Sequence, residues 1–249
     1  MKRESQGKIK KSLLSSRLRC IASLVTPGGI VADIGTDHGF LPVELVKNGI
    51  CSGGICSDIG KGPIERARQH VSEAGETVAS KIDVRLGDGL STLKKGEADS
   101  IVIAGMGGLL IRDILKAEPE IAADAKELIL SPHTEIPEVR RYLSDAGFVI
   151  LNEKMILEDG KFYTVIRAVK GAEASLTDEE IEFGPVLLRE RPETFLQYLQ
   201  WKIKKTKAVF EKLSREKETA LISVARREKE AEIRRLETVL QNGKPCKGE

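Results

Sequence analysis

The strongest constraint on the fold is an alternation of short apolar runs with longer amphipathic segments between residues 30 and 170. The runs are rich in Val and Ile, which favours strands over helices. We expect strands at residues 30–35, 54–58, 82–86, 99–104, 127–130, 148–156 and 161–169. Helices are expected between them, near residues 41–48, 61–74, 107–117 and 136–146. This order predicts an α/β fold with a parallel sheet and helices on both of its faces.

The last two runs are joined by Glu158-Asp159-Gly160, and Asp-Gly is a strong signal for a β-hairpin turn. The parallel sheet is therefore expected to end in an antiparallel hairpin. That ending is typical of class I methyltransferases, whose Rossmann-like sheet carries an antiparallel seventh strand. Folds that bind NAD lack it, so the pattern favours the methyltransferase sheet.

Residues after about 175 show no strand pattern. Side chains recur there at alternating spacings of three and four, which predicts a heptad seam along one helix. The seam consists of Leu196, Leu199, Ile203, Thr206, Phe210 and Leu213. A second helix is expected at about 217–241, after a turn near Ser214. Its residues expected to face the first helix are Leu221, Val224, Ala225, Ala231, Leu236 and Val239.

These patterns divide the chain into two expected domains. Residues 1–170 would form the Rossmann-like domain with a basic N-terminal helix, and residues 171–249 a helical, coiled-coil-like domain. The net charge of +2 is unevenly spread along them. Residues 1–20 and residues 186–249 each carry a net charge of +6, whereas the residues between them carry −10. Basic ends on an acidic body suit an enzyme that grips a polyanion, although a solvated helix face with a basic tip has the same composition.

Composition excludes several classes of protein. No run of 18 apolar residues occurs and the N-terminus lacks the apolar core of a signal peptide, so neither a membrane span nor secretion is expected. The four cysteines form no CxxC pair and no metal-like cluster with the three histidines. Reduced thiols, no bound metal and a cytoplasmic location are therefore expected.

Acidic and glycine residues follow four successive expected strands. Because the carboxyl ends of parallel strands meet at one edge of a sheet, these residues are expected to form one ligand site. Asp58 would accept hydrogen bonds from a ribose diol, and Asp88 would contact the amine of an adenine. The expected cofactor-binding residues are Asp33, Gly35, Asp37, His38, Asp58, Ile59, Asp88, Gly89, Ala104, Gly105, Met106 and Gly107.

The loop at residues 33–40 decides between cofactors. Its glycines are spaced wrongly for the G-x-G-x-x-G turn that binds a dinucleotide, and the carboxylates of Asp33 and Asp37 would repel a pyrophosphate. S-adenosylmethionine has no phosphate, and its sulfonium and ammonium groups are cations that carboxylates attract. A phosphate-binding P-loop at Lys61 is excluded because Gly62 replaces the required Ser or Thr. The loop therefore predicts S-adenosylmethionine as the cofactor.

Four segments of the chain resemble the bacterial tRNA (adenine-22, N1)-methyltransferases. They are residues 33–42 (DIGTDHGFLP), 58–63 (DIGKGP), 87–90 (GDGL) and 103–108 (IAGMGG). The resemblance implies a Rossmann-like catalytic domain, a coiled-coil C-terminal domain, S-adenosylmethionine as methyl donor and tRNA as substrate. Two segments depart from the family pattern. Gly39-Phe40 stands where a small residue and tyrosine are expected, and Ser131-Pro132-His133 stands in place of a Gln-Pro pair.

The candidate catalytic residues are Asp37, His38 and Met106. Ring nitrogen N1 of adenine offers a lone pair and needs no deprotonation, so Asp37 would mainly stabilise the growing positive charge. His38 would contact the cofactor or the substrate, or it is a structural histidine that bonds a loop carbonyl. Phe40 and His133 are the candidate substrate-binding residues, and Phe40 would either stack on the extruded base or fill the core.

Other basic residues are candidates for phosphate binding, namely Arg112, Arg140, Arg141 and the basic side chains of the C-terminal helices. The expected partner is tRNA, with no membrane and no obligatory protein partner. Two other functions stay open at this point. A methyltransferase for a small molecule or a protein would not need the basic ends, and an RNA-binding protein without catalysis would not need four aligned strand-end loops.

Overall fold

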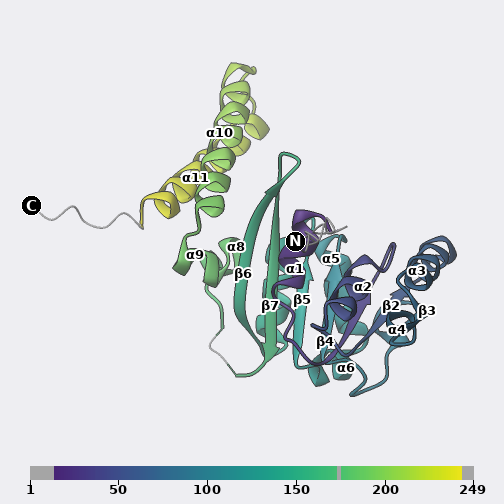
Figure 1. Ribbon diagram of the computed structural model, residues 1–249. Coiled ribbons are helices and arrows are strands. Elements are labelled where there is room, and N and C mark those ends of the chain that lie inside the picture. The colour runs from purple at the N-terminus through teal and green to yellow at the C-terminus, as the bar shows by residue number, and fades with distance from the viewer. Residues whose placement is uncertain (1–13, 173–174, 243–249) are drawn as a thin grey trace, which may run out of the picture.

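The computed structural model describes residues 14–172 and 175–242, and in them seven strands form one sheet (Figure 1). The strands are β1 (Ile30–Ile34), β2 (Gly53–Asp58), β3 (Ile82–Leu86), β4 (Ser100–Ala104), β5 (Glu127–Ser131), β6 (Phe148–Glu158) and β7 (Lys161–Lys170). Their order in the sheet is β3-β2-β1-β4-β5-β7-β6. The pairs among β1 to β5 are parallel, whereas β7 is antiparallel to both β5 and β6. This confirms the predicted Rossmann-like sheet with a hairpin at its end.

The turn between β6 and β7 explains why the hairpin is tight. Asp159 and Gly160 have φ angles of 49° and 73°, so both lie in the left-handed region that a two-residue type I′ turn requires. The twist of this turn matches that of paired strands, and Asp-Gly is among the few residue pairs that adopt it readily.

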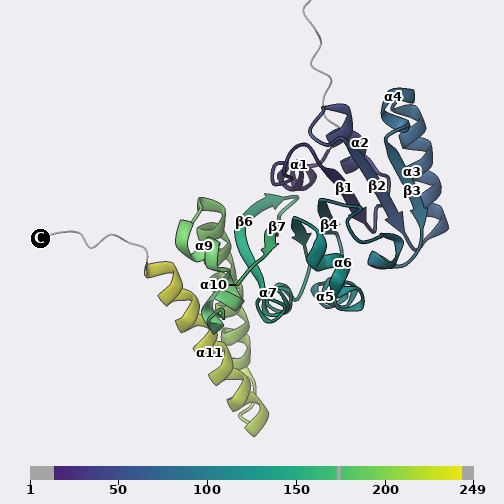
Figure 2. The same cartoon turned by 90° about the horizontal axis from the view of Figure 1, so that it is seen from below.

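Helices cover both faces of the sheet, as Figure 2 shows along its edge. One face carries α1 (Ser16–Ala22), α2 (Phe40–Lys47), α3 (Lys61–Glu73) and α4 (Glu76–Ala79). The other carries α5 (Gly108–Ala117), α6 (Pro119–Asp124) and α7 (Ile136–Asp145), with the short 3-10 helix η1 (Gly89–Thr92) beside them. Successive side chains of β1 point to opposite faces, so Val31 packs in the first apolar layer and Ala32 in the second.

Four helices follow the sheet: α8 (Asp178–Phe183), α9 (Pro185–Glu190), α10 (Glu193–Arg215) and α11 (Ala220–Gln241). The helices α10 and α11 project past the tip of the β6–β7 hairpin (Figure 1) and away from the sheet (Figure 2). Helices α4, α6, α8 and α9 were not predicted individually because they are too short for an apolar period to emerge. Of the expected basic N-terminal helix, the structure describes the part that forms α1, and residues 1–13 lie outside the described residues.

The expected seam of α10 is present, because Leu199, Ile203 and Thr206 are buried. The expected face of α11 is partly wrong. Leu236 and Val239 are buried, but Leu221, Val224 and Ala231 are exposed. Residues three or four positions apart lie on the same face of a helix. Counting back from Leu236 in such steps reaches the half-buried residues Ile233, Ala225 and Ile222. The three exposed residues lie outside this face. The turn also differs: Ser214 lies within α10, and the chain leaves the helix after Arg215.

A buried ion pair joins the C-terminal helices to the sheet. Arg140 on α7 donates from Nε to Glu153 Oε1 on β6 at 2.8 Å, and both side chains are almost fully buried. The same guanidinium donates to the carbonyls of Ile181 and Glu182 at the end of α8. The other carboxylate oxygen of Glu153 accepts from the backbone N–H of Val186 on α9 at 3.0 Å. The prediction that Arg140 binds phosphate is therefore wrong, because its side chain is enclosed and paired with Glu153.

We expect Arg140→Ala to lower the free energy of unfolding by about 3–5 kcal/mol, because Glu153 would remain charged and buried without its cation. The neighbouring Arg141 is exposed and provides a matched control, and Arg141→Ala should change stability by less than about 0.5 kcal/mol. Urea unfolding followed by circular dichroism measures both. Equal stability of the two variants would show that the pair contributes little.

Candidate functional site

The loop after β1 is shaped by backbone hydrogen bonds and by one threonine. The N–H groups of Gly35 and Thr36 donate to the carbonyl of Ser57 on β2 at 2.8 and 2.9 Å. Thr36 Oγ1 donates to Asp33 Oδ2 at 2.7 Å and accepts from the N–H of Gly39 at 3.1 Å. Gly35 and Gly39 have φ angles of 76° and 66°, which disfavour any other residue. The conformation of Gly39 explains why glycine suits this position, where the sequence departs from the family pattern.

A cavity of about 360 Å³ opens beside this loop, at the carboxyl ends of β1 and β4. It is lined by Arg17, Leu18, Asp33, Gly35, Thr36, Asp37, His38, Gly39, Phe40, Leu41, Ala104, Gly105 and His133. Eight of the residues predicted for the site from sequence therefore meet in one cavity: Asp33, Gly35, Asp37, His38, Phe40, Ala104, Gly105 and His133.

Other predicted residues lie along the same edge of the sheet but outside the lining of this cavity. Asp58 accepts from the N–H of Gly60 at 2.7 Å, and Ile59 is 72% exposed. Asp88 and Gly89 line a separate cavity of about 390 Å³ against α5. Since β2 and β3 follow β1 in the sheet, these side chains continue the row of strand ends away from the first cavity.

The two remaining predicted residues shape the loop after β4. The side-chain methyl of Met106 covers Gly35, because a β-carbon at Gly35 would lie 1.9 Å from Met106 Cε. The carbonyl of Met106 accepts from the N–H of His133 at 2.8 Å, which joins this loop to the one after β5. Gly107 precedes α5 and takes an extended backbone conformation. Met106 therefore packs directly against the glycine turn of the site.

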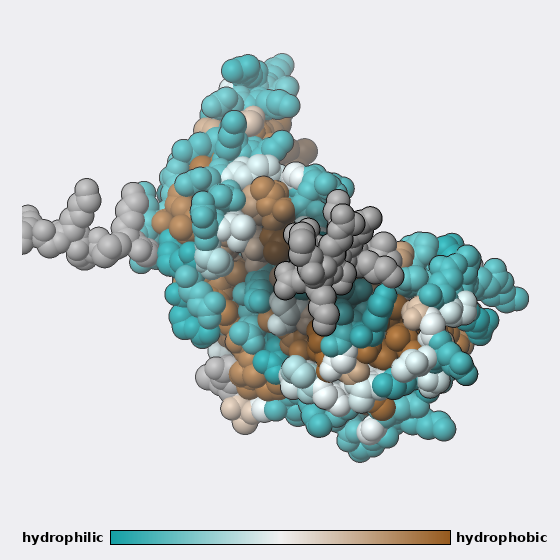
Figure 3. Space-filling model, in the orientation of Figure 1, coloured by the Kyte–Doolittle hydropathy of each residue, from teal (hydrophilic) through white to brown (hydrophobic). Residues whose placement is uncertain are grey.

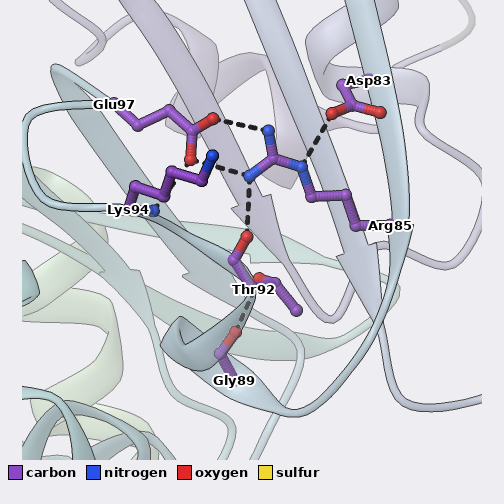
Figure 4. A network of polar contacts seen from close by, with 6 residues as sticks. All are labelled: Asp83, Arg85, Gly89, Thr92, Lys94 and Glu97. Carbon is purple, nitrogen blue, oxygen red and sulfur yellow. Dashed lines mark hydrogen bonds and ion pairs between the residues drawn. The ribbon is translucent and has the colours of Figure 1, made fainter.

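A network around Arg85 holds the loop that carries Gly89 (Figure 4). The guanidinium lies between Asp83 and Glu97, with nitrogen–oxygen distances of 2.8 and 2.6 Å, and donates to the carbonyl of Thr92 at 2.7 Å. The Thr92 hydroxyl donates in turn to the carbonyl of Gly89 at 3.0 Å. The hydrogen bonds from Arg85 lower the pKa of Glu97 to about 2, so the pair stays charged at neutral pH. The network thereby orders the chain after β3.

Asp33 is the electrostatically unusual group of the cavity. Burial raises the pKa of its carboxyl from 3.8 to about 6, the Thr36 hydrogen bond opposes this rise, and the charge of Asp58 adds to it. Within the described part of the chain, no Lys, Arg or His forms an ion pair with Asp33. A partly buried carboxylate without a cation favours a positively charged ligand.

Aromatic and charged side chains form one wall of the cavity. Arg66 of α3 pairs with Asp37, and His38 Nε2 lies 3.3 Å from the other Asp37 oxygen. The rings of His38 and Phe40 stack, with centroids 5.0 Å apart. The rings of His70 and Phe40 make a T-shaped contact, with centroids 4.6 Å apart, and His70 Nδ1 lies 3.1 Å from the His38 carbonyl. His70, rather than His38, is thus the histidine that bonds a loop carbonyl.

The opposite wall is built from three elements distant in sequence. Arg17 of α1 places Nη1 2.6 Å from His133 Nε2, and its guanidinium lies 5.2 Å from the ring centroid of Tyr163 on β7. Burial lowers the pKa of His133, and the charges of Arg17 and Lys161 lower it further. The neutral imidazole can therefore accept a hydrogen bond from the guanidinium.

Sequence reasoning missed Arg17, Thr36, Arg66, His70 and Tyr163. Arg17 contributed only to the count of basic residues near the N-terminus, which cannot single out one position. Tyr163 carried no signal beyond its place in an expected strand. Arg112 and Arg141, which were predicted to bind phosphate, both pair with Glu138 at the surface of α7.

Comparison with known proteins identifies the family to which this chain belongs. The family model for TrmK, tRNA (adenine(22)-N(1))-methyltransferase, matches residues 31–237. The chain belongs to this family. A tRNA (adenine(22)-N(1))-methyltransferase of Bacillus subtilis is 36% identical over 211 residues, covering 83% of this chain and 88% of the relative.

Solved structures agree with the family. The crystal structure of the Bacillus subtilis M1A22 tRNA methyltransferase TrmK has a TM-score of 0.82 at 33% identity, covering 93% of this chain and 100% of that one. A putative tRNA (m1A22) methyltransferase of Streptococcus pneumoniae, in complex with S-adenosyl-L-methionine, has a TM-score of 0.82 at 33% identity. That comparison covers 92% of this chain and 100% of the Streptococcus protein. The family, predicted from four sequence segments, and the fold, predicted from the alternation of strands and helices, are thus confirmed.

Two features are absent from the described residues. Residues 14–172 and 175–242 contain no helix long and apolar enough to cross a membrane. In the same ranges, His, Cys, Asp and Glu side chains form no group of three that could hold a metal ion.

We expect Asp33 of the ligand-free protein to bind a proton near pH 6, as measured by the pH dependence of its side-chain carbon resonance. Because the folded pKa lies above the ordinary 3.8, the folded state binds more protons than the unfolded state between these values. The free energy of unfolding of the wild type, relative to Asp33→Asn, should therefore fall as pH rises from about 4 to about 6. A midpoint near pH 4 would contradict this assignment.

Proposed function

We propose that this protein transfers the methyl group of S-adenosylmethionine to N1 of adenine 22 in tRNA. The observation that carries the proposal is the Asp33 carboxylate, which faces a cavity at the carboxyl end of β1 without a cationic partner. The α-ammonium of the cofactor supplies such a cation, whereas the pyrophosphate of a dinucleotide would be repelled by this carboxylate. Membership of the tRNA (adenine(22)-N(1))-methyltransferase family supports the reaction and the substrate.

The order of strands in the sheet supports a direction for the cofactor. Strand ends lie about 4.8 Å apart, so β3, β2, β1 and β4 present Asp88, Asp58, Asp33 and Ala104 in a row. In this proposal, Asp88 contacts the adenine, Asp58 the ribose diol and Asp33 the amino-acid end of the cofactor. The neighbouring backbone of these loops completes the site, at Gly35, Ile59, Gly89, Ala104, Gly105 and Gly107.

The reacting nitrogen does not have to be activated by the protein. Adenine N1 attacks the methyl carbon with its own lone pair and the sulfur leaves as a neutral thioether, so no general base is needed. The protein aligns the two reactants and tolerates the cationic product. We assign Asp37 to stabilising that charge, His38 to orienting the Asp37 carboxylate, and Met106 to packing beside the methyl donor.

The target base has to leave its stack to reach the cavity. Phe40 lies half-buried in the cavity wall, with its ring supported by His38 and His70, and we assign it to stacking on the extruded base. His133 on the opposite wall would contact the other side of the substrate. Both assignments follow from position, since each side chain lines the same cavity as Asp33.

We assign the grip on tRNA to the basic C-terminal helices and place a domain boundary near residue 170. In this division, residues 1–170 bind the cofactor and residues 171–249 bind tRNA. The proposed location is the cytoplasm, where tRNA is the substrate, and we propose no obligatory protein partner. Because Arg140 and Glu153 fix α8 and α9 to the sheet, the helices would hold tRNA in a defined position over the site.

The test of the reaction uses an unmodified tRNA transcript and unlabelled S-adenosylmethionine, and the nucleosides of the product are analysed by mass spectrometry. We expect 1-methyladenosine in this transcript and none when adenine 22 is replaced by guanine. Asp33→Ala should slow the reaction at low cofactor concentration by about 10-fold or more, because a buried hydrogen-bonding partner is lost. Equal methylation of the two transcripts would exclude adenine 22 as the target.

The role of the helices is tested with Lys204 and Lys205, which are exposed on α10. Changing both to Gln should weaken tRNA binding and reduce the slope of log Kd against log salt concentration by about 1–2, since each phosphate contact releases a counterion. Lys47 at the end of α2 and Lys81 just before β3 are exposed on elements distant from α10 in the sequence, and they serve as the matched double control. An identical salt dependence for both double variants would remove α10 from the tRNA-binding surface.

A further inference from the structure

The single tryptophan of the chain is exposed on α10. Trp201 is 44% exposed, and its ring centroid lies 5.7 Å from that of Phe162 on β7 and 6.2 Å from that of Tyr198 on α10. Leu157 of β6 pairs in register with Phe162 and is 48% exposed. We call these four residues the aromatic patch. Figure 3 shows an apolar surface between the two elements that carry them, the β6–β7 hairpin and α10.

The aromatic patch lies beside the cavity, on the other side of the hairpin. The pairing of β7 with β5 begins at Ile166, so residues 161–164 extend past the carboxyl end of β5, the edge at which the cavity opens. Successive side chains of a strand point to opposite faces. Phe162 accordingly contacts α10, whereas the Tyr163 ring contacts His133 in the cavity lining. One hairpin tip therefore separates the patch from the cavity.

Neighbouring rings hold the indole in place and leave part of it exposed. The rings of Tyr198 and Trp201 are stacked, with an interplanar angle of 28°, and Phe162 contacts both of them. Phe162 and Tyr198 are themselves half-buried against the apolar cluster below α10. A large flat ring that is already immobilised loses little entropy when a second flat group stacks on it.

Three exposed lysines surround the aromatic patch: Lys161, Lys204 and Lys205. Lys161 precedes Phe162 at the hairpin tip, and the other two follow Trp201 by one helical turn. Among the residues that the structure describes, no carboxylate forms an ion pair with any of the three. Aromatic rings among free cations are the combination that binds single-stranded nucleic acid, because bases stack on the rings while phosphates contact the cations.

We propose that the aromatic patch stacks one unpaired base of the tRNA, a base other than the adenine that is methylated. The inference rests on the proposed function and adds a second point of contact to it. An RNA strand held on both sides of the hairpin tip is fixed along its length, which helps to select the adenine that reaches the cavity. A second copy of this chain is a poorer occupant, since a symmetric contact would bring its unpaired lysines against these three.

The first experiment uses the fluorescence of the full chain, which reports on the patch alone because Trp201 is the single tryptophan. We expect an unmodified tRNA transcript to quench this emission as it binds. A blunt RNA duplex of equal length has no unpaired base, so it should bind through charge and leave the emission nearly unchanged. Unchanged emission of the wild type when the transcript is bound overturns the inference.

The second experiment measures methylation kinetics. Trp201→Ala should raise KM for the transcript about 10-fold with kcat nearly unchanged, because the stacked base is held equally before and during methyl transfer. Trp201→Phe keeps a ring and should restore most of the affinity. Val209→Ala is the matched control, since Val209 is also on α10 and 44% exposed but has no ring. The slope of log Kd against log salt concentration should be the same in Trp201→Ala and the wild type, because stacking releases no counterion.

The outcomes distinguish the possible failures. Equal KM values for Trp201→Ala and Val209→Ala overturn the inference. A dimer of the wild type that Trp201→Ala abolishes without a change in KM, measured by sedimentation, assigns the patch to a second copy instead. If Trp201→Ala does not fold, the emission of the wild type decides. A wild type that neither binds nor methylates the transcript refutes the proposed function, whereas one that methylates it with unchanged emission refutes only the role of the aromatic patch.

Discussion

The parallel pairing of β1 with β2 on one side and β4 on the other determines where every functional loop lies. Asp33 pairs in register with Cys56 and Val102, so the chain leaves these three strands at nearly the same level. From β1 the connections run in one direction to β2 and β3 and in the other to β4 and β5. The loops after β1 and β4 consequently diverge, and the space between them is the cavity. A shift in this register would separate Asp33 from Gly105 without changing any residue of the site.

The molecule contains two kinds of buried charge, one with an ion-pair partner and one without. Arg140 and Glu153 are enclosed together and satisfy each other, with backbone groups completing their hydrogen bonds. Asp33 receives a single hydroxyl from Thr36 and has no cation beside it. The first arrangement stabilises the junction between sheet and helices. The second reduces stability locally and leaves a charge free for a ligand, which is a common property of binding sites.

The sequence was sufficient to predict the role of a residue where the local chain alone explains why that residue type is present. The Asp159-Gly160 turn and the glycines Gly35 and Gly105 after β1 and β4 belong to this group, since positive φ angles require them. Reasoning failed where the partner lies elsewhere in the chain. Nothing near Arg140 in the sequence indicates that Glu153 will enclose it, and nothing near Arg17 points to His133. The face of α11 failed for a related reason, because its apolar residues surround the helix and only packing against α10 selects a side. Asp58 and Asp88 lie on the expected edge but outside the cavity around Asp33.

An apolar surface is visible between α10 and the β6–β7 hairpin (Figure 3), and Leu157 and Trp201 are exposed large side chains of these elements. The hairpin itself is assembled from the last part of the sheet to be synthesised, and β7 inserts between β5 and β6. Until residues 161–170 leave the ribosome, β5 has an open edge beside the buried residues Leu128, Ile129 and Leu130. Unpaired apolar strand edges are prone to associate with other chains. A nascent chain that pauses just before this point would expose that edge to neighbouring chains until β7 inserts.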